Sequence, residues 1–128
     1  MIRVLVIDPE KQTAKSITEA LSGPEMLPIV VGNLEEALQE FERNPPHAVI
    51  LAAHAKGEQS EGLCRAVCER TLAPLLVVGK HDCDLTVERM LSAGADAHVV
   101  EPFSGEVLVA QLWALLRRVG LVSSPYLV

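Results

Sequence analysis

Five short apolar runs recur along the chain, and each is followed by a segment whose apolar residues recur at helical spacing. The runs are continuously apolar and too short for free-standing helices, so they predict strands buried on both faces of a parallel sheet. They cover residues 2–7, 27–31, 46–53, 73–78 and 97–100. The run at 46–53 has the pattern expected of the central strand.

The intervening segments predict five helices. Asn33 and Ser104 are suited to cap the second and the last of them, and Glu36 completes a capping-box pattern with Asn33. The helices are expected at about residues 11–22, from 34 to before 44, from 60 onward, at about 84–93, and from 104 onward. In the last helix an apolar stripe stands at heptad-like spacing, formed by Val107, Leu108, Leu112, Leu115 and Leu116.

Five strand-helix units in succession predict the fold class. It is α/β, a doubly wound five-stranded parallel sheet between two layers of helices, in a flavodoxin-like (βα)5 arrangement. Pro28 places its strand toward an edge of the sheet, where a proline is tolerated. Residues 1–119 are expected to form one domain. Residues 120–128 contain Ser-Ser-Pro followed by apolar residues, which predicts a linker or the start of a further domain.

Composition narrows the class of protein. The 128 residues carry a formal net charge of -6 and no run of lysine or arginine, which argues against direct nucleic-acid contact by this segment. Three cysteines with no secretory leader favour reduced thiols, and no apolar run is long enough to span a membrane. The expected location is the cytoplasm.

The strand ends indicate what kind of site to expect. In open parallel α/β sheets, ligands bind at the carboxyl ends of the strands. The central strand ends there in Ala52 and Ala53, whose side chains carry no reactive group, whereas Asp8 follows the first strand. The pattern therefore predicts a regulatory fold without its reactive groups.

Three segments carry a resemblance to a known family. They are residues 4–8 (Val-Leu-Val-Ile-Asp), residues 62–65 (Gly-Leu-Cys-Arg) and residues 91–103, which run from Leu-Ser-Ala-Gly-Ala-Asp to Val-Val-Glu-Pro-Phe. Over residues 1–119 the chain resembles the receiver domains of bacterial two-component response regulators. The third segment is the most specific of the three.

The resemblance implies a phosphorylation site that this chain has largely lost. In the family, two acids follow the first strand, a phosphoacceptor aspartate ends the central strand, a hydroxyl residue ends the fourth, and a lysine follows the fifth. Only Asp8 fits that pattern, and His98 stands where the family usually has an aromatic switch residue. The four departures are Pro9, Ala52, Gly79 and Glu101.

These departures predict that ordinary phosphorylation does not occur. The methyl side chain of Ala52 cannot attack phosphorus, and an acyl phosphate needs an anionic nucleophile, a metal ion and hydrogen-bond donors. Glu101 in place of a lysine reverses the charge that would face a phosphate. The resemblance therefore points to an atypical receiver, or pseudo-receiver.

Other sites remain as alternatives. Asp8, Glu10 and Glu101 could converge on a divalent cation, although Glu10 could equally face solvent in the first turn of a helix. Cys64, Cys68, His81 and Cys83 could bind zinc, although cysteines at helical spacing more often fill a core. No cofactor signature is present. Two further alternatives remain. The emptied site could bind a small ligand, or the three carboxylates could support enzyme catalysis.

The four histidines show no metal-ligand spacing. His47, His54 and His81 are interpreted as surface residues or as residues satisfied by their neighbours. His98 is different, because at a switch position its imidazole could bias the neighbouring surface with pH.

Interaction with other proteins is the function that remains. Receivers of the family often pair through the fourth helix, fifth strand and fifth helix, so the resemblance implies a homodimer. The end of the last helix also resembles receivers joined to winged-helix domains, which implies a DNA-binding effector domain beyond residue 128 and a role in transcription regulation. The interface candidates are Leu85, Met90, Leu108, Leu112 and Trp113, and some of these five must face the core instead.

Overall fold

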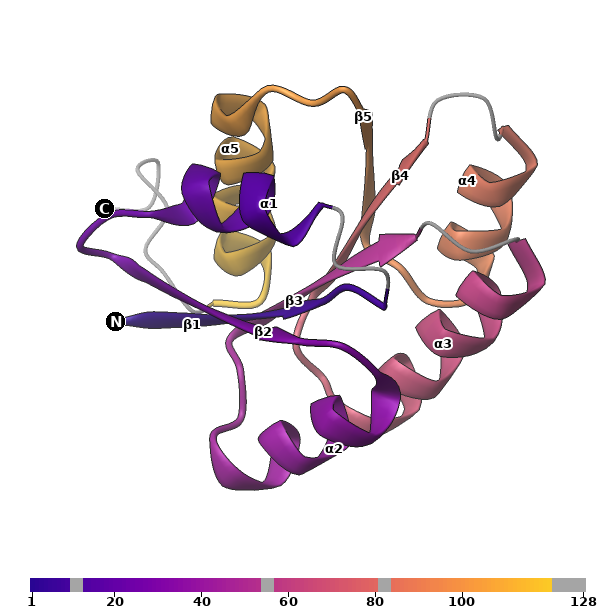
Figure 1. Cartoon of the computed structure of the whole chain (residues 1–128), viewed down its shortest axis with the longest axis horizontal. Helices are drawn as coiled ribbons and strands as arrows, with labels where there is room; N and C mark the ends of the chain where they lie inside the picture. Colours follow the sequence, from indigo (N-terminus) through magenta and orange to yellow (C-terminus); the bar gives the residue numbers. More distant parts are fainter. Residues whose placement is uncertain (10–12, 54–56, 81–83, 121–128) are drawn as a thin grey trace.

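The structure is a computed structural model that describes residues 1–9, 13–53, 57–80 and 84–120 (Figure 1). Strands and helices alternate along the chain. The strands are β1 (Ile2–Ile7), β2 (Met26–Val31), β3 (Ala48–Ala53), β4 (Leu75–Lys80) and β5 (Ala97–Glu101). The helices are α1 (Ala14–Leu21), α2 (Leu34–Arg43), α3 (Gly57–Arg70), α4 (Asp84–Ser92) and α5 (Gly105–Arg118).

The five strands form one parallel sheet in the order β2-β1-β3-β4-β5. This order confirms the predicted fold class and places β3 at the centre of the sheet. All six residues of β3 are buried, as their continuous apolar sequence predicts. Pro28 lies on edge strand β2, as expected, where it pairs with Val4 of β1.

Helices cover both faces of the sheet. Figure 1 shows α1 and α5 on one face and α2, α3 and α4 on the other. Because successive side chains of a strand point to opposite faces, β1, β2, β3 and β4 each contribute to two separate cores. Val6, Ile50 and Val78 pack with α1 and α5, whereas Ile7 and Leu51 pack with the other three helices.

The predicted caps form, with one change of partner. Asn33 Oδ1 accepts a hydrogen bond from the Glu36 backbone N–H at 2.8 Å. Glu36 Oε2 accepts from the N–H of Gly32 at 2.8 Å, one residue before the Asn33 N–H that a capping box uses. Ser104 Oγ accepts from the Val107 N–H at 3.4 Å, which caps α5. Both helices therefore begin where their cap residues predict.

Two details differ from the sequence-based expectation. Helix α3 begins at Gly57, three residues before Ser60, and β4 and β5 continue to Lys80 and Glu101. Val107 is exposed, not buried, because it lies beside Leu108, which takes the core-facing position in the first turn of α5. The other four residues of the predicted apolar stripe of α5 are buried.

The buried central strand should dominate stability. Replacing Leu51 with alanine should lower the free energy of unfolding by about 2–5 kcal/mol, because its 0% exposed side chain would leave a cavity in the core. Leu72, which is 101% exposed, offers a matched control. Leu72→Ala should change the free energy of unfolding by less than about 0.5 kcal/mol. Urea denaturation of both variants measures the difference, and equal losses would contradict the placement of β3.

Candidate functional site

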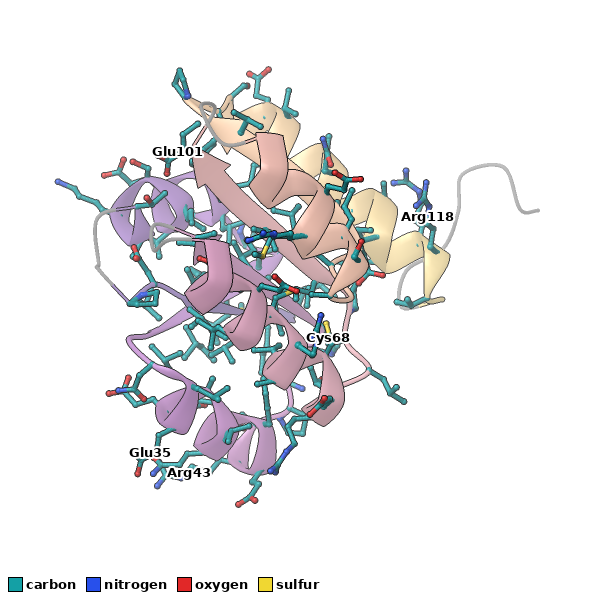
Figure 2. All side chains as sticks on the ribbon, turned by 90° about the vertical axis from the view of Figure 1, so that its right-hand side faces the viewer. Glu35, Arg43, Cys68, Glu101 and Arg118 are labelled. Atoms are coloured by element: carbon teal, nitrogen blue, oxygen red, sulfur yellow. The ribbon has the colours of Figure 1, made fainter. Side chains whose placement is uncertain are left out.

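The sheet register brings together the residues that the resemblance assigns to a degenerate phosphorylation site. Ile7 pairs with Leu51, so Asp8 and Ala52 occupy the next positions on neighbouring strands. Gly79 pairs with Ala53 on one side, and Lys80 pairs with Glu101 on the other. The residues that the sequence assigns to this site thus lie at one edge of the sheet, the carboxyl edge, with Glu101 at the end of β5 (Figure 2).

Asp8 is fully buried, and its carboxylate binds the start of α1. Its Oδ2 atom accepts hydrogen bonds from the backbone N–H groups of Thr13 at 2.9 Å and Ala14 at 2.8 Å. The first N–H groups of a helix lack partners within the helix, and the helix dipole favours an anion there. Asp8 therefore caps α1 from the preceding strand, in addition to any role at the sheet edge.

Thr13 links the start of α1 to the end of β5. Its hydroxyl donates to Glu101 Oε1 at 2.7 Å, the short distance expected for a hydrogen bond to a carboxylate. Asp8, Thr13 and Glu101 thus form one hydrogen-bonded group, which we call the carboxylate bridge, across β1, α1 and β5. Glu101 stands where the resemblance implies a lysine, and here its carboxylate is engaged within the protein.

Sequence reasoning did not select Thr13. Its position at the N-cap of α1, five residues after Asp8, was the available signal, because threonine is a common capping residue. However, Thr13 uses its hydroxyl to reach Glu101 and makes no side-chain hydrogen bond to its own helix end. Only the folded structure brings residues 13 and 101 together.

His98 packs over Gly79. A Cβ atom at Gly79 would lie 2.9 Å from His98 Nε2, closer than real Cβ contacts, so the imidazole occupies the space where a larger residue's side chain would begin. Nε2 is buried and has no hydrogen-bond partner within the described residues. Burial lowers the pKa of His98 below its ordinary 6.5. A neutral imidazole therefore fills the position of the family's hydroxyl residue.

The alternative metal sites gain no support. Across the residues that the structure describes, no three His, Cys, Asp or Glu side chains gather as a metal site would need. Glu10, His81 and Cys83 lie outside the described residues, as does His54. The proposed cation and zinc sets therefore stay incomplete.

The two described cysteines of α3 behave as core residues. Cys64 is buried, its thiol lies 3.6 Å from the Met90 carbonyl, and burial raises its pKa to about 12. Burial also raises the pKa of Cys68 (Figure 2), whose sulfur packs on Gly94. Gly94 has φ +119, and a Cβ there would lie 2.7 Å from that sulfur, so both backbone and space favour glycine. Neither thiol is activated toward chemistry.

The interface candidates need correction. Met90, Leu108 and Leu112 are fully buried in the two cores, so their side chains cannot contact a partner. The side chain of Leu85 lies outside the described residues. Trp113 is half-buried and faces α1, where it lines two neighbouring hollows of about 570 and 150 Å³. None of these five residues is therefore shown to lie exposed on the surface formed by α4, β5 and α5.

The contact between Gly79 and His98 should appear as an energetic coupling. Gly79→Ala should destabilise the domain by about 1–3 kcal/mol, because the new methyl group overlaps the imidazole. In a His98→Ala background that loss should fall by about 1–2 kcal/mol. Urea denaturation of the wild type, the two single variants and the double variant measures this coupling. Gly62→Ala, on α3 with open space around it, is the matched control and should be neutral or stabilising. Independent effects of Gly79 and His98 would contradict the contact.

The carboxylate bridge should depend on the Thr13 hydroxyl. Thr13→Val removes the donor to half-buried Glu101 and should lower the free energy of unfolding by about 0.5–1.5 kcal/mol. Thr18 donates to the Lys15 carbonyl at an exposed position on the same helix, so Thr18→Val should change the stability by less than about 0.5 kcal/mol. Thermal and urea unfolding measure both variants, and equal effects would count against the bridge.

Comparisons with known proteins agree with this arrangement. No family model matches the chain. The sensory transduction protein RegX3 of Mycolicibacterium smegmatis is 30% identical over 118 residues, 92% of this chain and 52% of RegX3. The transcriptional regulatory protein CseB of Streptomyces avermitilis is 35% identical over 88 residues, 69% of this chain and 37% of CseB. The chain thus spans about half the length of RegX3, and the alignment with CseB covers less.

The fold comparison extends over nearly the whole chain. The BeF3-activated DrrB receiver domain superposes with a TM-score of 0.76 and 25% sequence identity, covering 92% of this chain and 99% of that domain. Within the described residues, no helix is both long and apolar enough to cross a membrane. Both the strand order and the sequence relatives point the same way, and the chain belongs to the receiver domains of the response regulator family.

Proposed function

We propose that this receiver domain regulates through protein-protein contacts that do not depend on phosphorylation. The observation that carries the proposal is Ala52, which is buried at the carboxyl end of β3, where the family places its phosphoacceptor. A methyl group has no lone pair with which to attack phosphorus. Pro9, Gly79 and Glu101 depart from the family pattern at the same edge of the sheet. None of these three residues restores the family's acceptor site around Ala52.

The carboxylate bridge supports this proposal. In receivers with an intact site, the acids after the first strand help to hold a divalent ion. In this chain, Asp8 directs its carboxylate to the N–H groups of α1, and Glu101 accepts from Thr13. Both carboxylates thus hold structural elements together, and a metal ion would have to compete with these hydrogen bonds for Asp8 Oδ2 and Glu101 Oε1. We therefore assign the domain no catalytic role.

The surface formed by α4, β5 and α5 supports self-association. β5 is an edge strand, and α4 and α5 flank it on opposite faces of the sheet. Leu91 on α4, Val100 on β5 and Val107 on α5 are 45%, 39% and 49% exposed. Exposed apolar side chains along a sheet edge favour contact with another chain. We propose a homodimer through these three elements, with Leu91 and Val107 in place of their buried neighbours.

A longer protein is part of the proposal. The chain matches about half of RegX3, and its relative CseB carries the name of a transcriptional regulatory protein. We propose that an effector domain follows residue 128 and binds DNA, while the receiver itself makes no nucleic-acid contact. The net charge of -6 supports that division, because phosphate backbones attract basic surfaces. The site of action would then be the cytoplasm.

Phosphoryl transfer is the first test. After incubation with Mg²⁺ and acetyl phosphate, intact-protein mass spectrometry should find no gain of a phosphoryl group, because Ala52 offers no nucleophile. A receiver with its acceptor aspartate, treated in parallel, shows that the donor is active. A stoichiometric phosphoryl adduct on this chain would overturn phosphorylation independence and would direct attention to another carboxylate at the same edge.

Self-association is the second test. Sedimentation across a dilution series should show a dimer whose dissociation constant does not change with Mg²⁺ and beryllofluoride. Val100→Glu should weaken the dimer at least tenfold, which is about 1.4 kcal/mol, because it places a charge in the apolar contact. Val30→Glu, on exposed edge strand β2, is the matched control and should leave the association unchanged. A monomer at all concentrations, or equal effects of the two variants, would overturn the proposed interface.

A further inference from the structure

Arg3 is held at the amino end of the sheet by the segment before β3. Its backbone N–H donates to His47 Nδ1 at 2.9 Å, and its carbonyl accepts from the His47 N–H at 2.9 Å. The guanidinium donates twice to the Pro45 carbonyl, at 3.2 Å from Nε and 2.9 Å from Nη2. Residues 45 and 47 thus bind both the backbone and the side chain of Arg3.

The imidazole extends the hydrogen bonding between β1 and β3. The first paired residues of these strands are Val4 and Ala48. Ahead of that pair the chain runs through Pro45 and Pro46, and His47 provides a ring nitrogen as the acceptor for the Arg3 N–H. The His47 side chain therefore acts at the end of a strand ladder as a backbone carbonyl would.

This contact requires the neutral form of His47. A nitrogen that accepts a hydrogen bond carries a lone pair, so the proton of the neutral ring must be on Nε2. In the imidazolium form both nitrogens are donors, and Nδ1–H would face the N–H of Arg3. Protonation therefore converts a donor-acceptor pair into two opposed donors, which must separate.

The charges around His47 act in the same direction. Burial lowers its pKa below the ordinary 6.5, and the positive charges of Arg3 and of the Met1 amino terminus lower it further. Residues 71–76, which lead into and begin β4, and residues 44–53 apart from His47 contain no ionisable side chain. On the far side of β1, Glu25 contacts Ile2 through its backbone carbonyl.

We propose that His47 is a proton-sensitive latch, which fastens the amino end of β1 to β3 when the imidazole is neutral and releases it when the ring is protonated. The unfolded chain takes up this proton more readily than the folded chain, because the folded pKa is lowered. The contribution of the latch to stability is complete above pH 6.5 and declines as the pH falls below that value. The latch lies at the amino ends of β1 and β3, whereas the degenerate phosphorylation site lies at the carboxyl ends of the strands. The two are therefore independent.

Asparagine provides a matched variant. In His47→Asn, Oδ1 occupies the position of Nδ1 along the side chain and can accept from the Arg3 N–H, but it does not titrate. His54, His81 and His98 remain in both proteins, so their titration contributes equally to each. The two proteins should therefore differ only through the proton on residue 47.

The experiment is amide hydrogen exchange at Arg3 by NMR, at pH 7.0 and pH 5.0, expressed as protection factors. At pH 7.0 the wild type and His47→Asn should protect this amide similarly. At pH 5.0 the wild type should lose protection at least tenfold relative to the variant. Equal protection in the two proteins at both pH values would overturn the latch.

The wild type alone provides a second readout, which does not depend on how the variant folds. Imidazole ¹⁵N shifts should show His47 with a proton on Nε2 and none on Nδ1 at pH 7.0, and a titration midpoint below 6.5. A proton on Nδ1 at neutral pH, or a midpoint at or above 6.5, would contradict the proposal.

Discussion

The complete burial of β3 is the constraint on which the rest of the structure depends. A strand with six buried residues must be apolar on both faces, and it needs a helical layer on each side to exclude water. The parallel register then lines up the ends of its neighbours at one edge. In this chain the same apolar character continues into Ala52 and Ala53, the positions from which a catalytic side chain would project. One strand thus specifies both the layered fold and the two buried alanines at its carboxyl end.

Asp8 and Glu101, which lie at that edge, form hydrogen bonds that hold the elements of the fold together. Asp8 is buried and would be costly without partners, and the first N–H groups of α1 satisfy it. Glu101 gains a short hydrogen bond from Thr13. Carboxylates that the resemblance would associate with a metal ion or a phosphate therefore join β1, α1 and β5 to one another. Leu91, Val100 and Val107 take no part in these hydrogen bonds, which is why the proposed assembly role is compatible with carboxylates that are engaged within the fold.

Periodicity predicted the strands and the central place of β3 well, because a continuous apolar run has few other solutions, and the residue types at 33 and 104 predicted two helix caps. Local pattern could not distinguish Leu108 from Val107 as the buried residue, since rotation of α5 by one position depends on how the helix packs. For the same reason the pattern could not tell which of the five interface candidates face the core, and in the structure Met90, Leu108 and Leu112 do so. Thr13 and Glu101 are far apart in sequence, so their hydrogen bond could not be read from spacing. The contact of His98 with Gly79 likewise depends on the register of β4 and β5.

The packing of His98 on Gly79 has a consequence for any attempt to build an acceptor site into this domain. A hydroxyl residue at position 79 would need the volume that the imidazole now fills. An aspartate introduced at position 52 would therefore still lack a hydroxyl neighbour at position 79 unless His98 were changed as well. Positions 52, 79 and 98 would have to change together, because a side chain at position 79 and the imidazole of His98 compete for the same space.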